Sequence, residues 1–277
     1  MATTQTKTAN PKKNSGFQGI RAAFWVIVFC FVIAVCIFKL LLGADANFVG
    51  GDNAGHPLNL LGTIYKGGMV VPIIHTLLLT VIALSIERFL ALRTAFGKGS
   101  LAKFTQEIKA AVNANDFTKA AQLCDKQKGS VANVVRASIN AYKEMEAAHG
   151  IKKAQKVAKI QQAHEEATQL EMPTLQMNLP IIATIVTLGT LTGLLGTVTG
   201  MIRSFQALAA GGGGDSLALS TGISEALINT AFGILTSWFA VISYNTFTNK
   251  IDKLTYALDE VGYTIAQTYE ANHTEEA

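Results

Sequence analysis

Charge is scarce in this sequence of 277 residues. Only 15% of the residues are Asp, Glu, Lys or Arg, whereas 49% are hydrophobic. So little charge is unusual for a soluble protein and indicates a membrane protein. The formal net charge is +4, and no cluster of Lys and Arg is interleaved with aromatic residues, so the sequence gives no support for nucleic-acid binding.

Cysteine and enzyme motifs are also scarce. The three cysteines, Cys30, Cys36 and Cys124, lack the spacing of metal ligands, and we expect buried free thiols rather than a disulfide framework. The sequence holds no Walker-type phosphate loop, nucleophile elbow, HExxH motif or paired CxxC motif. We therefore predict no catalytic residues, no metal site and no cofactor, and we expect a protein that is not an enzyme.

Long apolar runs are abundant instead. Four stretches reach the length of about 20 residues that a helix needs to cross a bilayer, and they lie at 22–43, 69–90, 179–202 and 217–247. The first run follows a polar, basic segment, but it is too long for a cleaved signal peptide. We therefore expect a retained anchor and four transmembrane helices.

Basic residues predict the orientation of these spans. Lys and Arg precede the first span and follow the second, whereas the segment between them holds one Lys against two Asp. The positive-inside rule then places both termini in the cytoplasm. In order, the prediction is a cytoplasmic tail (1–21), a periplasmic loop (44–68), a cytoplasmic helical domain (91–178), a second periplasmic loop (203–216) and a cytoplasmic C-terminal helix (248–277).

The polar segments predict more helices. Apolar residues recur at spacings of three and four in 101–175, without the alternation of a strand. We expect an all-α protein whose long helices leave the bilayer and form a cytoplasmic bundle. Pro173 is expected to break or kink the helix that leads into the third span, and Glu87 and Arg88 are expected to form an ion pair at the membrane interface.

The third span carries small residues where lipid would favour leucine. Gly189, Gly193, Gly196 and Gly200 are spaced by four, three and four residues, so they fall on one stripe of a helix. Such a stripe lets two helix backbones approach closely. The nearby threonines allow two interpretations: hydroxyls bonded to carbonyls of their own helix, or a hydroxyl-lined wall of a wet path.

The fourth span contains a carboxylate. Glu225 and Asn229 share one helix face, Gly233 extends it, and Thr230 lies about 140° from Glu225 around the axis. A carboxylate within a membrane indicates a partner, a water cavity or a proton relay, although Glu225 is close enough to the outer end of the span to be simply solvated. His75 in the second span is either a proton relay or a neutral side chain bonded to a carbonyl.

Two consecutive motifs then suggest a family. The run LPIIATIVTLGTLTGLLGTVTGMIRSF, followed by GISEALINTAFGILTSWFAVISYN, resembles the MotA/TolQ/ExbB proton-channel family and, within it, the ExbB/TolQ branch. The resemblance covers about residues 70–260. Thr190 and Phe239 stand where that branch often has proline, and the span at 22–43 is additional to the three-span ExbB plan. Four spans match the layout of MotA, but the motif residues favour ExbB/TolQ.

The resemblance implies a homo-oligomeric ring, generally a pentamer, around the membrane helix of a smaller ExbD/TolR-like partner. An aspartate of that partner takes up protons, which are the coupling ions. Thr197 and Thr230 match the threonines that line the ring, and Glu225 matches the intramembrane glutamate near them. Asn229 would add a hydrogen bond on the same proton pathway, and the glycines, with Gly233, would pack the helices.

The expected function is therefore a subunit of an inner-membrane motor. With its partner and a TonB-like protein, it would convert the proton motive force into work for import across the outer membrane. Alternatives within the family are TolQ-type maintenance of the outer membrane and a gliding-type or flagellar-type stator. Alternatives from other classes are a secondary transporter, although no internal symmetry is found, and a structural scaffold.

Overall fold

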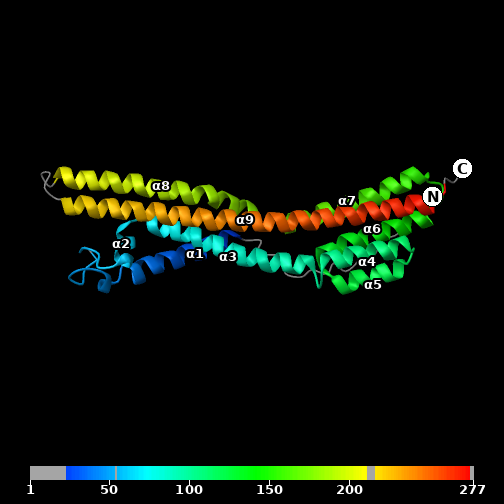
Figure 1. Cartoon of the computed structure of the whole chain (residues 1–277), viewed down its shortest axis with the longest axis horizontal. Coiled ribbons are helices and arrows are strands. Elements are labelled where there is room, and N and C mark those ends of the chain that lie inside the picture. Colours follow the sequence, from blue (N-terminus) through cyan, green and yellow to red (C-terminus); the bar gives the residue numbers. More distant parts are fainter. Residues whose placement is uncertain (1–22, 54, 211–215, 275–277) are drawn as a thin grey trace, which may run out of the picture. The chain divides into compact units, whose positions relative to one another are not determined.

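The chain is all-helical, as predicted. The computed structural model describes residues 23–53, 55–210 and 216–274, in which no strand occurs and one isolated bridge joins Phe48 to Pro57. The N-terminal tail and the glycine run of the second expected loop lie outside these residues. The elements (Figure 1) are α1 (Ala23–Cys36), the π-helical η1 (Ile37–Leu42), the 3-10 helix η2 (Asp45–Asn47), α2 (Leu60–Lys66), α3 (Val70–Phe96), α4 (Leu101–Asn113), α5 (Phe117–Gln127), α6 (Gly129–Ala147), α7 (Lys153–Gln176), α8 (Leu179–Ala210) and α9 (Ser216–Asn272).

Within the described residues, four helical stretches are long and apolar enough to cross a membrane, in agreement with the predicted number. They lie within Ala23–Leu42, Val70–Asn113, Lys153–Gln206 and Leu219–Asn272. Large apolar side chains such as Trp25, Leu194 and Trp238 are more than half exposed on them, as expected for surfaces that face lipid or other membrane helices. Helix α8 continues beyond the expected end of its span to Ala210, because no helix breaker precedes the glycine run.

The chain divides into two compact units, which are described separately. The spanning unit comprises the described residues of 20–89 and 176–249, and the helical unit those of 90–175 and 250–277. Helices α3 and α9 contribute residues to both units.

Amphipathic helices build the helical unit. Helix α5 packs against both α4 and α6, and Asp116 caps the start of α5 by accepting a hydrogen bond from the Lys119 amide at 2.9 Å. Tyr142 is buried with its ring centroid 4.4 Å from that of Phe117 and 4.9 Å from that of Tyr269. These contacts join α5, α6 and the last turns of α9 into one core.

The cysteines are free thiols, and two of the three are buried as expected. Burial raises the pKa of the Cys124 thiol to about 12, so it stays protonated. The prediction was wrong for Cys36, which is exposed. Cys30 and Ala34 lie one turn apart on the buried face of α1, and Cys36 lies on another face of that helix.

The helix before the third span does not end at the proline, and an asparagine lies in the turn that follows the helix. Helix α7 continues through Pro173 to Gln176. Asn178 then adopts a positive φ of 63°, a conformation that asparagine tolerates better than most residues, and α8 starts at Leu179. The predicted break at Pro173 was therefore wrong, and the two helices are separated at Asn178 instead.

Glu87 and Arg88 form an ion pair, as predicted, and it is buried within the spanning unit. Arg88 is 0% exposed and Glu87 5%. The Arg88 Nε donates to the Glu87 Oε2 at 2.6 Å, and the Asn178 Nδ2 donates to the same oxygen at 3.2 Å. The pair thus also holds the turn between α7 and α8 against α3.

The described residues between α1 and α3 form a hydrogen-bonded part of the spanning unit. The Asn47 Nδ2 donates to the carbonyls of Leu41 and Leu42 at 2.8 and 3.0 Å, and the Asn59 Nδ2 donates to the Asn47 Oδ1 at 2.9 Å. Leu42, Ile64 and Val71 form a buried cluster to which α9 adds Ile228 and Phe232. These contacts fix α2, and with it Lys66 and Gly67, beside α9.

Candidate functional site

The glycine stripe of α8 lies directly against α9. A Cβ added at Gly193 would lie 3.0 Å from the Gly233 Cα, and one at Gly196 would lie 2.5 Å from the Asn229 Cβ. Gly189 and Gly200 approach α9 in the same way, at Ser237 and Ala226. Only glycine allows backbones this close, so the stripe sets the spacing of the two helices.

Two threonines meet beside the glycine stripe. The hydroxyl of Thr197 on α8 is hydrogen-bonded to that of Thr230 on α9, and both hydroxyl oxygens lie 3.2 Å from the carbonyl oxygen of Gly193. Both side chains are half-buried. Each hydroxyl has one proton and two lone pairs, so the pair keeps a free acceptor position for a group or a water outside the chain. The Thr197 hydroxyl lies within hydrogen-bonding distance of a carbonyl of its own helix, as the first interpretation predicts, and the wet path of the second stays a prediction.

Asn229 ties α9 to the end of α2. Its side chain is 2% exposed, and its Nδ2 donates to the Gly67 carbonyl at 3.0 Å. Its Oδ1 is buried without a hydrogen-bond partner among the described residues. A buried amide oxygen without a partner is uncommon, and Asn229 is one of the residues that line the cavity described next.

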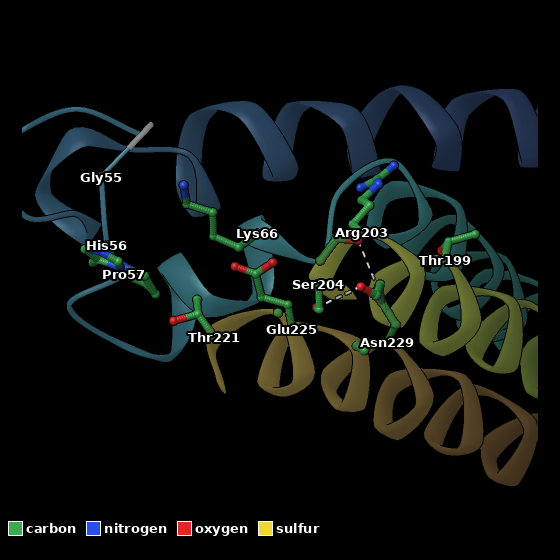
Figure 2. Close-up of a pocket in the computed structure, with 14 residues that line it drawn as sticks. Gly55, His56, Pro57, Lys66, Thr199, Arg203, Ser204, Thr221, Glu225 and Asn229 are labelled. Atoms are coloured by element: carbon green, nitrogen blue, oxygen red, sulfur yellow. Dashed lines mark hydrogen bonds between the residues drawn. The ribbon is translucent and has the colours of Figure 1, made fainter. Parts of the chain in front are cut away.

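Glu225 borders a polar cavity of about 280 Å³. Figure 2 shows the three charged side chains that line it, Lys66 from α2, Arg203 from α8 and Glu225 from α9. The Glu225 side chain is half-buried. The remaining lining residues are Gly55, His56, Pro57, Gly67, Thr199, Gly200, Ser204, Thr221, Gly222, Ala226 and Asn229. The carboxylate thus faces a space that can hold water, with two cations nearby.

The structure brings only some of the predicted site residues together. Asn229 and Glu225 line the cavity, whereas Thr197 and Thr230 do not. Asn229 connects the two groups, because it lies one turn after Glu225 and directly before Thr230. The site is therefore a cavity and a threonine pair joined along α9.

Sequence reasoning missed Lys66 and Arg203. Both were visible as isolated basic residues beside spans, but no spacing linked them to Glu225.

His75 is a side chain bonded to a carbonyl, the second of its two interpretations. Its Nδ1 donates to the Val71 carbonyl oxygen at 2.8 Å, and its ring centroid lies 5.1 Å from that of Phe232.

Metal chemistry finds no support in the part of the chain that the structure describes. Among those residues, no group of three or more His, Cys, Asp and Glu could hold a metal ion. What the arrangement offers is hydrogen bonding and one carboxylate at the edge of a water-sized space. Such groups can pass protons.

Comparisons with known proteins agree on one family. A family model, that of the MotA/TolQ/ExbB proton channel family, matches residues 127–260. The chain is 26% identical over 208 residues to the Tol-Pal system protein TolQ of Pseudomonas aeruginosa, an alignment that covers 72% of this chain and 87% of that protein. It is 37% identical over 87 residues to the putative biopolymer transport protein ExbB-like 3 of Synechocystis sp., with 31% and 41% covered.

Proposed function

Because the chain belongs to the MotA/TolQ/ExbB proton channel family, we propose that it is the membrane subunit of a proton-driven motor in a bacterial inner membrane. Copies of the chain form a ring around the membrane helix of a smaller ExbD/TolR-like partner. Protons that cross the ring move this partner, which carries the work towards the outer membrane. Both termini and the helical unit lie in the cytoplasm, as the basic residues predict.

The threonine pair is the observation that carries this proposal. Thr197 and Thr230 place two hydroxyls and the Gly193 carbonyl at one half-buried point of two apolar helices. Unused hydrogen-bonding capacity is unfavourable against lipid. A partner helix that bears a carboxyl group satisfies it, because the hydroxyls can accept from the protonated acid and, when they turn away from the Gly193 carbonyl and from each other, can donate to the carboxylate.

Glu225 serves the outer end of the proton path. Water in the cavity brings protons to its carboxylate, and Asn229 and Thr230 continue the polar line one turn further along α9. A proton that moves through a potential of 100 mV releases about 2.3 kcal/mol. Several protons are therefore needed for each mechanical step of appreciable size.

The system that receives the work is proposed to be TonB-dependent import, with a TonB-like protein as a further partner. The identity of 37% to an ExbB-like protein supports this choice. The longer alignment, at 26% identity, is to a TolQ and supports maintenance of the outer membrane as the alternative. Co-purification separates the two, because the first requires an ExbD-like and a TonB-like protein and the second a TolR-like protein.

Proton uptake into liposomes tests the proposed function. The full chain, purified with a candidate ExbD-like partner, is placed in vesicles that contain a pH-sensitive dye, and a potassium diffusion potential is applied. We expect acidification that requires the partner and falls at least tenfold in Glu225→Gln. Vesicles that hold both proteins in a folded complex and yet take up no protons would contradict the proposal.

A secondary transporter is the second candidate, and the cavity is the observation that favours it. A volume of about 280 Å³ with two cations and one carboxylate is close to the size of a small-molecule site. This candidate predicts solute uptake by the chain alone, without a partner.

A further inference from the structure

A second cavity lies within the helical unit, between the start of α7 and the end of α9. Its volume is about 160 Å³. The lining residues are Ile151, Lys153, Lys156, Tyr269, Asn272, His273 and Thr274. They include two ammonium groups and an imidazole but no carboxylate, so the lining is cationic.

Lys156 is the unusual member of this lining. It is only 7% exposed, and among the described residues its Nζ has neither a hydrogen-bond partner nor an ion pair. Other cations of the same unit find carboxylates, as in the pairs Lys109–Glu260 and Arg136–Asp125. Its ammonium group borders the cavity, so an anion bound there would supply the counter-charge that the described residues do not.

The first turn of α7 adds donors at the same place. The first helical bonds are those that the Gln155 and Lys156 amides donate to the Lys152 carbonyl, at 2.9 and 3.0 Å. The amides at the very start of a helix have no partner within it, and the helix dipole is positive there. Lys153, the first residue of α7, is half-buried in the same lining. Backbone amides and two lysines thus surround one small space.

His273 closes the other side in a fixed orientation. Its Nδ1 donates to the Tyr269 carbonyl at 3.0 Å, and its ring stacks on that of Tyr269 with centroids 4.1 Å apart. The Asn272 Nδ2 is held by the Asn115 Oδ1 at 2.9 Å. The wall provided by α9 is therefore formed before any ligand arrives.

We propose that this cavity binds the phosphate group of a small anion, either free phosphate or a phosphate ester. A dianionic tetrahedral group matches two lysines and a helix N-terminus in charge and in number of acceptors. The volume corresponds to roughly five waters, which fits a phosphate group but not a whole nucleotide. The bound anion joins the start of α7 to the end of α9, the helix that also carries Glu225 and Thr230. The proposal rests on the proposed topology in one respect only: the anion comes from the cytoplasm because the helical unit is proposed to lie there.

Thermal unfolding of the purified full chain in phosphate-free buffer tests the site. Titration with inorganic phosphate is expected to raise the midpoint in a saturable way, because a ligand of the folded state stabilises it. In Lys156→Met the apparent affinity falls about tenfold or more, as expected for the loss of a charged hydrogen-bond donor.

Three comparisons make the test specific. Lys159→Met, an exposed lysine one turn along α7, should respond to phosphate like the wild type. Sodium sulfate at equal ionic strength separates a specific site from a general salt effect. Glycerol 3-phosphate separates the two sources: a response equal to that of phosphate assigns a phosphate ester, and a response to phosphate alone assigns the free ion. If Lys156→Met does not fold, Lys153→Gln with binding measured by equilibrium dialysis replaces it.

The rival occupant is the chain itself, since Glu275 and Glu276 follow Thr274 in the sequence. If their carboxylates fill the cavity, the wild type does not respond to phosphate, and a variant with both changed to Gln unfolds at a lower temperature. That result, or an equal phosphate response of wild type and Lys156→Met, would overturn the proposal. The assay needs neither partner nor proton gradient, so its failure is distinct from failure of the proposed function.

Discussion

Thr197 and Thr230 are the residues on which proton coupling depends in the proposed function. Their hydroxyls share the Gly193 carbonyl and are hydrogen-bonded to each other, while both side chains remain half-buried. Polar groups in this state are neither fully satisfied inside the chain nor simply solvated. A carboxyl group on a partner helix is the complement that their geometry suits.

Thr197→Val tests this role. Valine keeps the shape of threonine but removes the hydroxyl, so the helices still pack while the hydrogen bond to Thr230 is lost. We expect proton uptake by the reconstituted complex to fall at least tenfold, with unchanged yield and size of the complex. The control is Thr184→Val, because the exposed Thr184 hydroxyl donates to the Pro180 carbonyl of its own helix at 2.8 Å. Normal uptake by Thr197→Val would exclude a role of this hydroxyl in coupling.

At the scale of elements, the contact between α8 and α9 depends on glycine. Gly196 is one of the tight points of this contact, since an added Cβ would lie 2.5 Å from the Asn229 Cβ. Asn229 cannot move away freely, because its Nδ2 is bonded to the Gly67 carbonyl. The packing of α8, α9 and the end of α2 is thus coupled through one asparagine.

Gly196→Ala is therefore expected to destabilise the folded chain by about 1–3 kcal/mol, the usual effect of overpacking. A lower midpoint of thermal unfolding in detergent would show it. Leu194→Ala is the matched control, because Leu194 is 56% exposed on the same helix and its truncation adds nothing to the interface. Equal midpoints for Gly196→Ala and the wild type would mean that the two helices are not held this closely.

In the helical unit, α6, α7 and α9 meet at a buried histidine. The Ser138 hydroxyl donates to the Val134 carbonyl at 3.0 Å, so the His164 Nδ1, 2.9 Å away, carries the proton and donates to that hydroxyl. The Nε2 is buried without a partner among the described residues, against the backbone of Gly262. Burial lowers the pKa of His164, and the charges of Asp259 and Glu165 offset part of this effect.

This lowered pKa makes stability depend on pH in a defined direction. Below about pH 6.5 an unfolded histidine binds a proton that the folded one excludes, so stability falls as the pH drops through 6.5 towards the folded pKa. We expect the unfolding midpoint to decrease between pH 7.5 and 5.5, and to decrease less in His164→Gln. Replacement of the exposed His149 by Gln should leave the wild-type decrease intact. A decrease of the same size in His164→Gln would assign it to other groups.

At the scale of the whole molecule, the structural features that depend on helical periodicity alone could be predicted from the sequence. The four spans and the glycine stripe with Gly193 and Gly196 follow from the constant turn of long helices. Because both α8 and α9 are uninterrupted across these positions, neighbours in the pattern are neighbours in space. Thr190 and Phe239, which replace prolines that the branch often has, fit the absence of a break in either helix.

The cavity beside Glu225 could not be predicted in this way. Lys66 and Arg203 reach it from α2 and α8, and the position of α2 depends on the hydrogen bonds of Asn47 and Asn59 in an irregular segment. No periodic pattern in the sequence predicts the course of such an irregular segment. The position of the boundary between α7 and α8 could not be predicted for a similar reason. It depends on the positive φ of Asn178 and on the hydrogen bond from the Asn178 side chain to Glu87.

The measurement that tests the central claim most directly is the native mass of the complex. The full chain is solubilised gently and weighed with and without a co-expressed ExbD-like partner. We predict a closed assembly of identical chains that gains a small, fixed number of partner copies. A monomer or dimer that survives mild detergent and takes up no partner would contradict a ring that encloses a partner helix.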